Sequence, residues 1–330
     1  MITLVADRPS DVLAVRFATS PAWETVLAAR TYAHGRARTM QRVWVDAIAG
    51  AAAGIDLEPL LAVNPRAGFV PDFLTPPPRA AAPRLREQLA EVRSTPPAQV
   101  EKELLRCRTG LTDRDQLEIL DALLDDPAAA RDALADLIET AWDVLVRPFW
   151  PRIRALLTAD IGHRAQLLAE HGLRRVVDDL DDRIAWAGSA ITIEARDDLS
   201  VDLDERGVVL MPSAFVWPGV VAITDSPWQP TIVYPARGIA ELWQRPPGTP
   251  DALGRLLGGT RAAILLALDA PASTTALADR LELSPSGASR HLTTLRDAGL
   301  VAGARYGHEV RYSRTRLAAM LIRAAAGTTS

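Results

Sequence analysis

Apolar positions with a helical period dominate the first 180 residues, and short runs with a period of two take over between about 190 and 235. The helical spacing predicts helices at residues 21–34, 40–53, 84–93, 99–108, 113–124, 128–146 and 150–169. The β-rich runs predict strands at residues 191–195, 199–203, 208–211, 214–217, 220–224 and 231–234. One more strand is expected at 2–5 or 13–17, and one short helix at 238–243. The predicted body is therefore mainly α (α+β), with a helical part and a small antiparallel sheet.

Proline-rich segments divide the chain further. Residues 64–83 include six prolines and are expected to form a rigid surface loop. Residues 245–250, with the sequence RPPGTP, are expected to be a stiff linker. The chain is therefore predicted to consist of an N-terminal domain over residues 1–245 and a second domain over residues 251–326.

Residues 284–299, with the sequence SPSGASRHLTTLRDAG, have the pattern of a DNA-recognition helix. Ser284 is the expected N-cap, Pro285 fits the first helical position, and Gly299 fits a left-handed C-cap. The predicted buried stripe consists of Leu292, Leu295 and Ala298. The outer side near the N-terminus then carries short polar groups and one guanidinium, which suit base edges and phosphates: Ser286, Gly287, Ser289, Arg290 and Thr293.

The neighbouring segments complete a winged helix-turn-helix. Residues 274–281 predict a short amphipathic helix, and residues 282–284 form the turn that leads into the recognition helix. Residues 300–305 and 309–313 predict two strands of a hairpin whose tip contains Gly307. Basic side chains on the helix and the hairpin are expected to hold DNA phosphates: His291, Arg305, His308, Arg311 and Arg314.

With these elements in place, residues 251–326 resemble the winged-helix domain of the ArsR-like (arsenical-resistance repressor) transcriptional regulators. The resemblance rests on LLGGTRAAIL at 256–265, SPSGASRHL at 284–292 and RDAGLV at 296–301, and it covers about a quarter of the chain. It implies sequence-specific binding to double-stranded DNA and repression relieved by an effector. Many members sense soft metals through cysteines on the helix before the recognition helix. Residues 274–281 contain no cysteine, so a non-thiolate effector is expected.

A homodimer is expected because such modules place two recognition helices one turn of DNA apart. Residues 252–268 and 315–325 are the candidate interface helices. The second of them is apolar at Leu317, Ala318, Leu321 and Ile322. The alternative is that both helices merely complete the core of their own module.

The charge distribution supports DNA as the partner, although the net charge of the whole chain is −4. Residues 284–316 contain six arginines and two acidic residues, a local charge of about +4. The start of the chain lacks a signal sequence, and Cys107 is the single cysteine, which excludes an intrachain disulfide. The uncharged run at 207–224 contains Pro212 and Pro218 and is not expected to be a membrane anchor. These features favour a cytoplasmic protein.

A regulator with a large second domain is expected to receive an input there. An apolar effector pocket beside the predicted sheet is one hypothesis, and ordinary core packing of the same aromatic residues is the alternative. The candidate lining residues are Trp186, Trp217, Trp228 and Tyr234.

An enzyme or small-molecule-binding protein, with the winged helix contacting other proteins, is the competing class. His163 and His171 lie near acidic residues at 178–182, but that segment indicates a charge-paired surface more than a metal site. Cys107 stands between two arginines, so it is either a redox sensor or a buried structural cysteine. No phosphate-binding loop or nucleophile elbow is present in the sequence. We therefore expect no catalytic residue, no metal and no cofactor.

Overall fold

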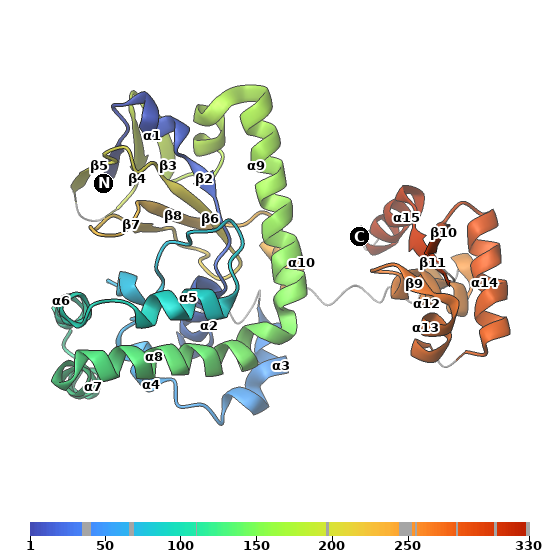
Figure 1. The fold of residues 1–330 in the computed structure, drawn as a ribbon, viewed down its shortest axis with the longest axis horizontal. Helices are drawn as coiled ribbons and strands as arrows, with labels where there is room; N and C mark the ends of the chain where they lie inside the picture. Colours follow the sequence, from blue (N-terminus) through green and yellow to red (C-terminus); the bar gives the residue numbers. More distant parts are fainter. Residues whose placement is uncertain are drawn as a thin grey trace. The chain divides into compact units, whose positions relative to one another are not determined.

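The computed structural model describes residues 1–34, 41–65, 69–109, 111–195, 198–243, 253–254, 256–281, 283–306 and 309–327. The chain divides into two compact units, Met1–Trp243 and Gln244–Ser330 (Figure 1). The predicted linker at 245–250, the hairpin tip at Gly307 and the candidate residue His308 lie outside the described residues.

The helices of the N-terminal unit agree with the apolar spacing, and two short ones (α1 and α4) were not predicted. Their bounds are α1 Pro9–Leu13, α2 Pro21–His34, α3 Arg42–Ala52, α4 Glu58–Ala62, α5 Leu85–Arg93, α6 Pro97–Arg108, α7 Arg114–Asp125, α8 Pro127–Ala141, α9 Trp150–Asp178 and α10 Ile239–Trp243. Asp113 and Asp126 accept backbone hydrogen bonds as the N-caps of α7 and α8. A π-helical turn over Trp142–Val146 and a 3₁₀ turn over Arg147–Phe149 join α8 to α9.

Two four-stranded sheets accompany these helices. The strands are β1 Ile2–Val5, β2 Arg16–Phe17, β3 Ile184–Ala187, β4 Ala190–Ile193, β5 Leu199–Asp202, β6 Val209–Ser213, β7 Val221–Ile223 and β8 Thr231–Pro235. The first sheet has the order β3-β4-β1-β5, and the second has the order β2-β6-β8-β7. The pairs β1–β5, β2–β6 and β6–β8 are parallel, and the pairs β1–β4, β3–β4 and β7–β8 are antiparallel.

The second sheet is buried on both faces, which explains the continuous apolar run of β6. Alternate residues Val209 and Met211 belong to the core formed with the helices. Leu210, on the other face, belongs to a second core, to which the first sheet and the last turns of α9 contribute. In Figure 1 the helices α5, α7 and α8 form a layer below the sheets, and α9, whose helical backbone is broken at Gly172, runs along the side of both layers.

Two predictions for the N-terminal unit are wrong, and a third holds only in part. The small antiparallel sheet is two mixed sheets, each of which contains a strand from the first 17 residues. Residues 214–217 do not form a strand but a bend, in which the Ser213 hydroxyl accepts hydrogen bonds from the N–H groups of Phe215 and Val216. The proline-rich loop is at the surface only in part, because residues 70–78 are buried whereas residues 79–82 are exposed. Prolines 76–78 have no N–H group, so their burial leaves fewer backbone donors to satisfy.

The C-terminal unit is a winged helix-turn-helix with a third short strand. Its elements are α12 Gly259–Ala267, β9 Ala272–Ser273, α13 Thr274–Arg280, α14 Pro285–Asp297, β10 Val301–Tyr306, β11 Glu309–Arg314 and α15 Arg316–Gly327. The strand order is β10-β11-β9. The hairpin was predicted, whereas β9, which pairs with β11, was not. The α+β class predicted from the sequence is confirmed.

Both ends of α14 form as the sequence predicts. The Ser284 hydroxyl accepts a hydrogen bond from the Gly287 N–H group at 3.1 Å. At the other end, Gly299 has a φ of 70°, and the N–H group of Leu300 donates to the carbonyl of Leu295 at 2.8 Å. This bond over five residues is the signature of a glycine-terminated helix end.

No described helix is both long and apolar enough to span a membrane. The uncharged run at 207–224 contributes to β6 and β7 instead.

Candidate nucleic-acid interface

The candidate interface is built on α14, which has one buried and one exposed side. Leu292 and Leu295 are buried in the core of the C-terminal unit, together with Leu277 of α13. The predicted third member of the stripe is wrong, because Ala298 is exposed and Ala288 is buried instead. Ala288 lies four residues before Leu292, so it continues the buried face by one more helical turn.

The predicted polar residues lie together on the opposite side of α14. Ser286, Ser289, Arg290 and Thr293 are exposed, whereas Gly287 and His291 are half-buried. The positions 286, 289, 290 and 293 follow the spacing i, i+3, i+4 and i+7, so they share one helical face. This face starts at the N-terminus of a 13-residue helix, where the free N–H groups and the helix dipole favour an anion.

Gly287 has a positional role that the sequence alone does not reveal. A Cβ atom at this position would lie 3.0 Å from the Ser284 Oγ atom that caps the helix. Glycine therefore leaves room for the cap. The Thr293 hydroxyl donates to the carbonyl of Ser289 at 3.0 Å, which leaves its oxygen lone pairs available to a donor.

The wing carries Arg305 on β10 and Arg311 on β11, both exposed. Arg305 pairs in register with Val310, and Arg311 pairs with Ala304. Because neighbouring positions of a strand point to opposite faces, the two arginines lie on opposite faces of the hairpin. Arg311 also lies near Glu309, with 3.8 Å between Nε and the carboxylate oxygen.

Arg314 does not have the predicted phosphate-binding geometry. Its Nε donates to the carbonyl of Leu265 at 2.7 Å, and its Nη2 donates to the carbonyl of Leu266 at 2.6 Å. These carbonyls belong to the last turn of α12, where no helical N–H group follows to satisfy them. Partial burial lowers the pKa of Arg314 below its ordinary value. The prediction for Arg314 is therefore wrong: this arginine closes the end of a helix.

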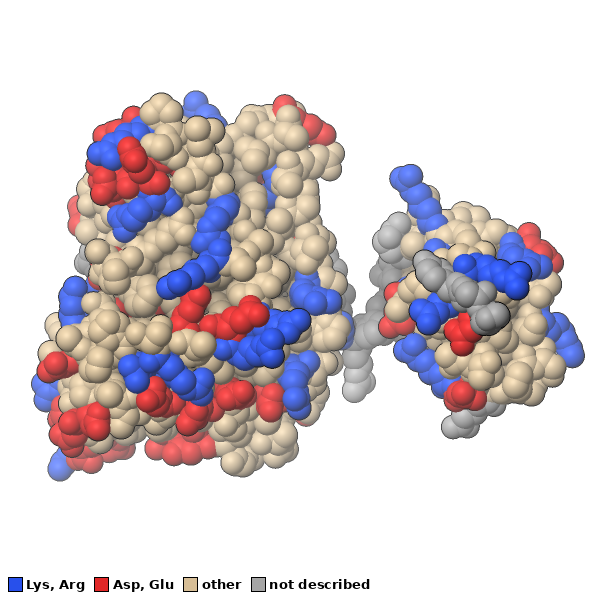
Figure 2. Space-filling view, in the orientation of Figure 1, with Lys and Arg blue, Asp and Glu red and all other residues tan. Residues whose placement is uncertain are grey.

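Figure 2 shows basic and acidic side chains at several places on both units. The local positive charge of residues 284–316 therefore rests on the sequence.

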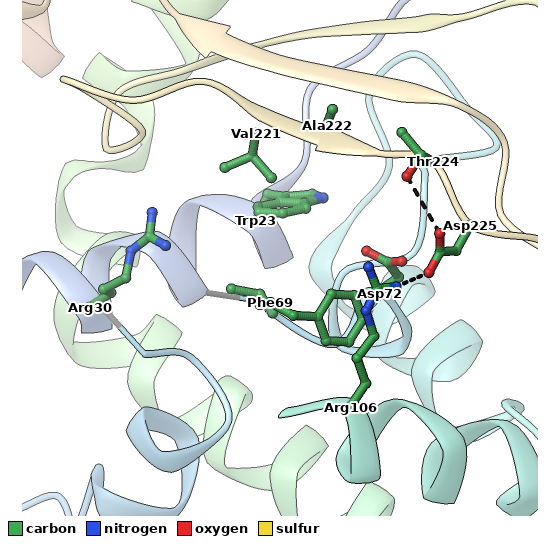
Figure 3. Close-up of a pocket in the computed structure, with 10 residues that line it drawn as sticks. Trp23, Arg30, Phe69, Asp72, Arg106, Val221, Ala222, Thr224 and Asp225 are labelled. Carbon is green, nitrogen blue, oxygen red and sulfur yellow. Dashed lines mark hydrogen bonds and ion pairs between the residues drawn. The ribbon is translucent and has the colours of Figure 1, made fainter. Parts of the chain in front are cut away.

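The four aromatic candidates for an effector pocket are distributed over different environments. Tyr234 is fully buried and donates its hydroxyl to Asp160 Oδ2 at 2.8 Å. Trp228 packs against the helical core, Trp186 packs against the second core, and Trp217 is 47% exposed. None of the four lines the pocket shown in Figure 3.

Cys107 and the two histidines also have defined environments. Cys107 is buried, and desolvation together with the nearby Glu103 raises the pKa of its thiol to about 12, which favours the structural interpretation. His163 lies beside Arg237, and its Nε2 is 3.7 Å from a carboxylate oxygen of Asp179. Within the described residues, no three His, Cys, Asp or Glu side chains are grouped closely enough to hold a metal ion.

The structure adds a polar pocket that the sequence analysis missed (Figure 3). Its volume is about 110 Å³. The lining residues come from α2, the segment before α5, α6, β7 and the residues that follow β7. They are Trp23, Arg30, Phe69, Val70, Asp72, Arg106, Val221, Ala222, Thr224 and Asp225. The spacing of Trp23 and Arg30, seven residues apart on one helix, was the available signal in the sequence.

Comparison with known proteins gives two matches to family models. Residues 256–304 match the model described as "Helix-turn-helix domain". This match contains α12, α13 and α14 and agrees with the resemblance to ArsR-like regulators, so the C-terminal unit is a DNA-binding type of domain. No curated protein matches the chain, and no solved structure matches it either. Residues 72–240 match the model described as "Family of unknown function (DUF5937)". Because this second match spans just over half of the 330 residues, the chain belongs to that family of unknown function.

Proposed function

We propose that the protein is a sequence-specific transcriptional regulator of the ArsR-like type that acts in the cytoplasm as a homodimer. In this proposal it represses its target genes, and a small-molecule effector releases it from DNA. The absence of cysteine from the sequence of α13 supports an effector that is not held by thiolates. We propose regulation rather than catalysis because, of the two family models that match, only the helix-turn-helix model describes a domain of known type.

The exposed polar face of α14 is the observation that carries this proposal. Two serines, a threonine and an arginine lie exposed on its outer side at the N-terminal end. The major groove admits one α-helix, and such short polar side chains allow the helix backbone to approach the base edges. Ser286, Ser289 and Arg290 are therefore the proposed base-contacting residues, with Arg290 pairing with a guanine.

Contacts with the DNA backbone are assigned to His291, Arg305 and Arg311. The half-buried position of His291 beside the exposed face supports a contact at the edge of the groove rather than with the bases. Arg305 and Arg311, on opposite faces of the hairpin, can reach phosphates on both sides of a wing that lies in a groove. These contacts position the protein and carry no sequence information directly.

The homodimer is supported by apolar side chains that α15 leaves at the surface. Ala318 is buried in the core of the unit, and Leu321 and Ile322 pack against that core. Leu317 and Met320, by contrast, are 55% and 54% exposed. Replacing both with aspartate should convert the dimer to a monomer in light scattering. A strict monomer of the unaltered protein at micromolar concentration would remove this part of the proposal.

Arg290→Ala, compared with Arg296→Ala, tests the proposed function. Both changes remove one positive charge from α14, but Arg296 lies six residues further along, about 9 Å from Arg290 along the helix axis and away from the N-terminal end that carries the proposed base contacts. Arg296 is exposed and pairs with the adjacent Asp297 at 3.6 Å. Affinity for DNA from the upstream region of the gene and for scrambled DNA is measured by fluorescence anisotropy for both variants.

The proposal predicts that Arg290→Ala weakens binding to the specific DNA by about 1–3 kcal/mol, roughly 5-fold to 150-fold. Its affinity for scrambled DNA should fall much less, and Arg296→Ala should change the ratio of the two affinities little. An equal loss on both DNAs for Arg290→Ala would show that this side chain does not contact bases.

A further inference from the structure

The pocket in the N-terminal unit has the features of a binding site for a small anion. Trp23 and Arg30 lie two helical turns apart on the same side of α2. Figure 3 shows Arg30 at one end of the pocket, Trp23 in the middle and the Arg106–Asp225 ion pair at the other end. Val221 and Ala222 of β7 cover the pocket from above in this view. Its wall is therefore apolar in the middle and charged at both ends.

The Trp23 indole is the first observation that indicates a ligand. Its side chain is 2% exposed, and its Nε1 atom has no hydrogen-bond partner among the described residues. By contrast, Nε1 of Trp44 donates to the carbonyl of Leu145 at 2.8 Å. A buried N–H group without an acceptor destabilises the folded state, and an oxygen atom of a bound molecule would supply that acceptor.

The second, independent observation is the charge at Arg30. Burial lowers the pKa of Arg30 below its ordinary value, so its cation is partly desolvated. No acidic side chain of the described residues forms an ion pair with it. Arg106, at the opposite end, pairs with Asp225 and also lies over the Phe69 ring, 4.0 Å from its centroid. Only the Arg30 end thus carries a positive charge that the described part of the pocket leaves uncompensated.

Asp72 does not neutralise this charge. Burial and the nearby Glu103 raise the pKa of Asp72 to about 8, so its carboxyl group is mostly protonated at neutral pH. Glu103 lies outside the pocket lining and accepts hydrogen bonds from the Phe73 N–H group and from Trp228 Nε1. The lining residues therefore have a net charge of about +1 at pH 7, which selects an anion.

The volume of the pocket restricts the anion to a small one. A cavity of about 150 Å³ accommodates benzene, which has six non-hydrogen atoms. A pocket of about 110 Å³ is smaller, so it fits an organic acid of no more than about six non-hydrogen atoms.

We propose that this pocket binds a short-chain hydroxy- or oxo-carboxylate. The carboxylate would pair with Arg30, the carbon chain would pack against Trp23 and Val221, and the second oxygen would accept the Trp23 indole N–H. The role of this ligand as the effector of the regulator rests on the proposed function. Its binding to the N-terminal unit does not.

Isothermal titration calorimetry on the full chain without DNA tests the pocket. The probes are glycolate and lactate, with lactamide as the uncharged control. Arg30→Gln replaces the cation with a shorter, neutral polar side chain, whereas Trp23→Phe keeps an aromatic ring and removes the N–H group. Arg114→Gln is the matched control, because Arg114 is an exposed arginine on α7 that pairs with Glu118. Circular dichroism verifies that each variant is folded.

The proposal predicts that at least one acid binds and that lactamide does not. Arg30→Gln should weaken binding about tenfold or more, and Trp23→Phe about threefold to tenfold, whereas Arg114→Gln leaves it unchanged. If Arg30→Gln does not fold, the loss in Trp23→Phe and the preference for the acid over lactamide still decide the result. Absence of binding for both acids at 10 mM, or equal binding of lactamide, would overturn the proposal.

Anisotropy with upstream DNA then separates the pocket from the proposed function. Release of DNA by the bound acid, lost in the Arg30→Gln and Trp23→Phe variants, supports both. Binding of the acid in calorimetry with unchanged DNA affinity supports the pocket and contradicts its role as the effector site.

Discussion

Replacing Glu24 with glutamine should remove a specific pH dependence from the stability of the N-terminal unit. Glu24 lies on α2 and is 1% exposed. Its Oε2 atom accepts a hydrogen bond from the N–H group of Ala214 at 3.0 Å, and the Ser213 hydroxyl also bonds to the carboxyl group. These two bonds do not offset the burial, which raises the pKa of Glu24 from 4.5 to about 8.

The direction in which stability changes with pH follows from the state, folded or unfolded, in which Glu24 keeps its proton. Between pH 4.5 and pH 8 the folded chain keeps Glu24 protonated, whereas the unfolded chain releases that proton. The contribution of Glu24 to stability is therefore complete below pH 4.5 and is lost as the pH rises toward 8. Each pH unit in this window is worth about 1.4 kcal/mol, so stability should fall by about 2 kcal/mol between pH 5.5 and pH 7.0.

Urea denaturation at pH 5.5 and pH 7.0, followed by tryptophan emission, measures this effect. All eight tryptophans lie in Met1–Trp243, so the signal reports on the N-terminal unit alone. The stability of Glu24→Gln relative to the unaltered protein should increase by about 2 kcal/mol between the two pH values. Glu118→Gln, at an exposed position on α7, should show no such change. A constant difference between Glu24→Gln and the unaltered protein at both pH values would refute the reasoning.

Three further predictions concern single positions. Gly207→Ala should destabilise the N-terminal unit by about 3 kcal/mol or more in urea denaturation, because φ is 62° and the added Cβ would lie 2.4 Å from the carbonyl oxygen of Ala14; a loss below 1 kcal/mol would contradict this. Arg314→Ala should lower the stability of the C-terminal unit by about 1–3 kcal/mol, seen as a shift in thermal unfolding by circular dichroism, because two carbonyls at the end of α12 lose their donor. The salt dependence of DNA binding should stay unchanged in that variant. A slope of log affinity against log salt concentration that is smaller by about one would show that Arg314 contacts a phosphate. Cys107 should not react with a thiol reagent in the folded protein at pH 8 but should react in urea, because burial raises the pKa of the thiol to about 12.

The recognition helix could be predicted from the sequence because its determinants are local. The cap at Ser284, the proline that follows it and the left-handed Gly299 all act within one or two turns of the helix. The apolar spacing identified the neighbouring helix and the hairpin for the same reason.

The arrangement of the sheets could not be predicted because the strand partners are far apart in the chain. β1 pairs with β4 and β5, which follow it by almost 190 residues or more. Apolar residues with a period of two identify a strand, but they do not identify the strand that pairs with it. The mixed parallel and antiparallel pairing of both sheets could therefore not be predicted.

The same limit applied to individual side chains. Arg311 and Arg314 are both arginines of β11, and only the position of the end of α12 shows that Arg314 is engaged there. Trp23 and Arg30 are visible as one helical face, but the residues opposite them come from the segment around Phe69 and from Asp225. That juxtaposition depends on the tertiary packing of segments that the sequence does not place together.

Fluorescence anisotropy of the purified protein on its own upstream DNA and on scrambled DNA, over a series of salt concentrations, tests the central claim most directly. A site-specific regulator should bind the upstream DNA about a thousandfold more tightly, and its affinity should fall steeply as the salt concentration rises. Equal affinity for both DNAs at every salt concentration would contradict the assignment of the exposed face of α14 to base recognition.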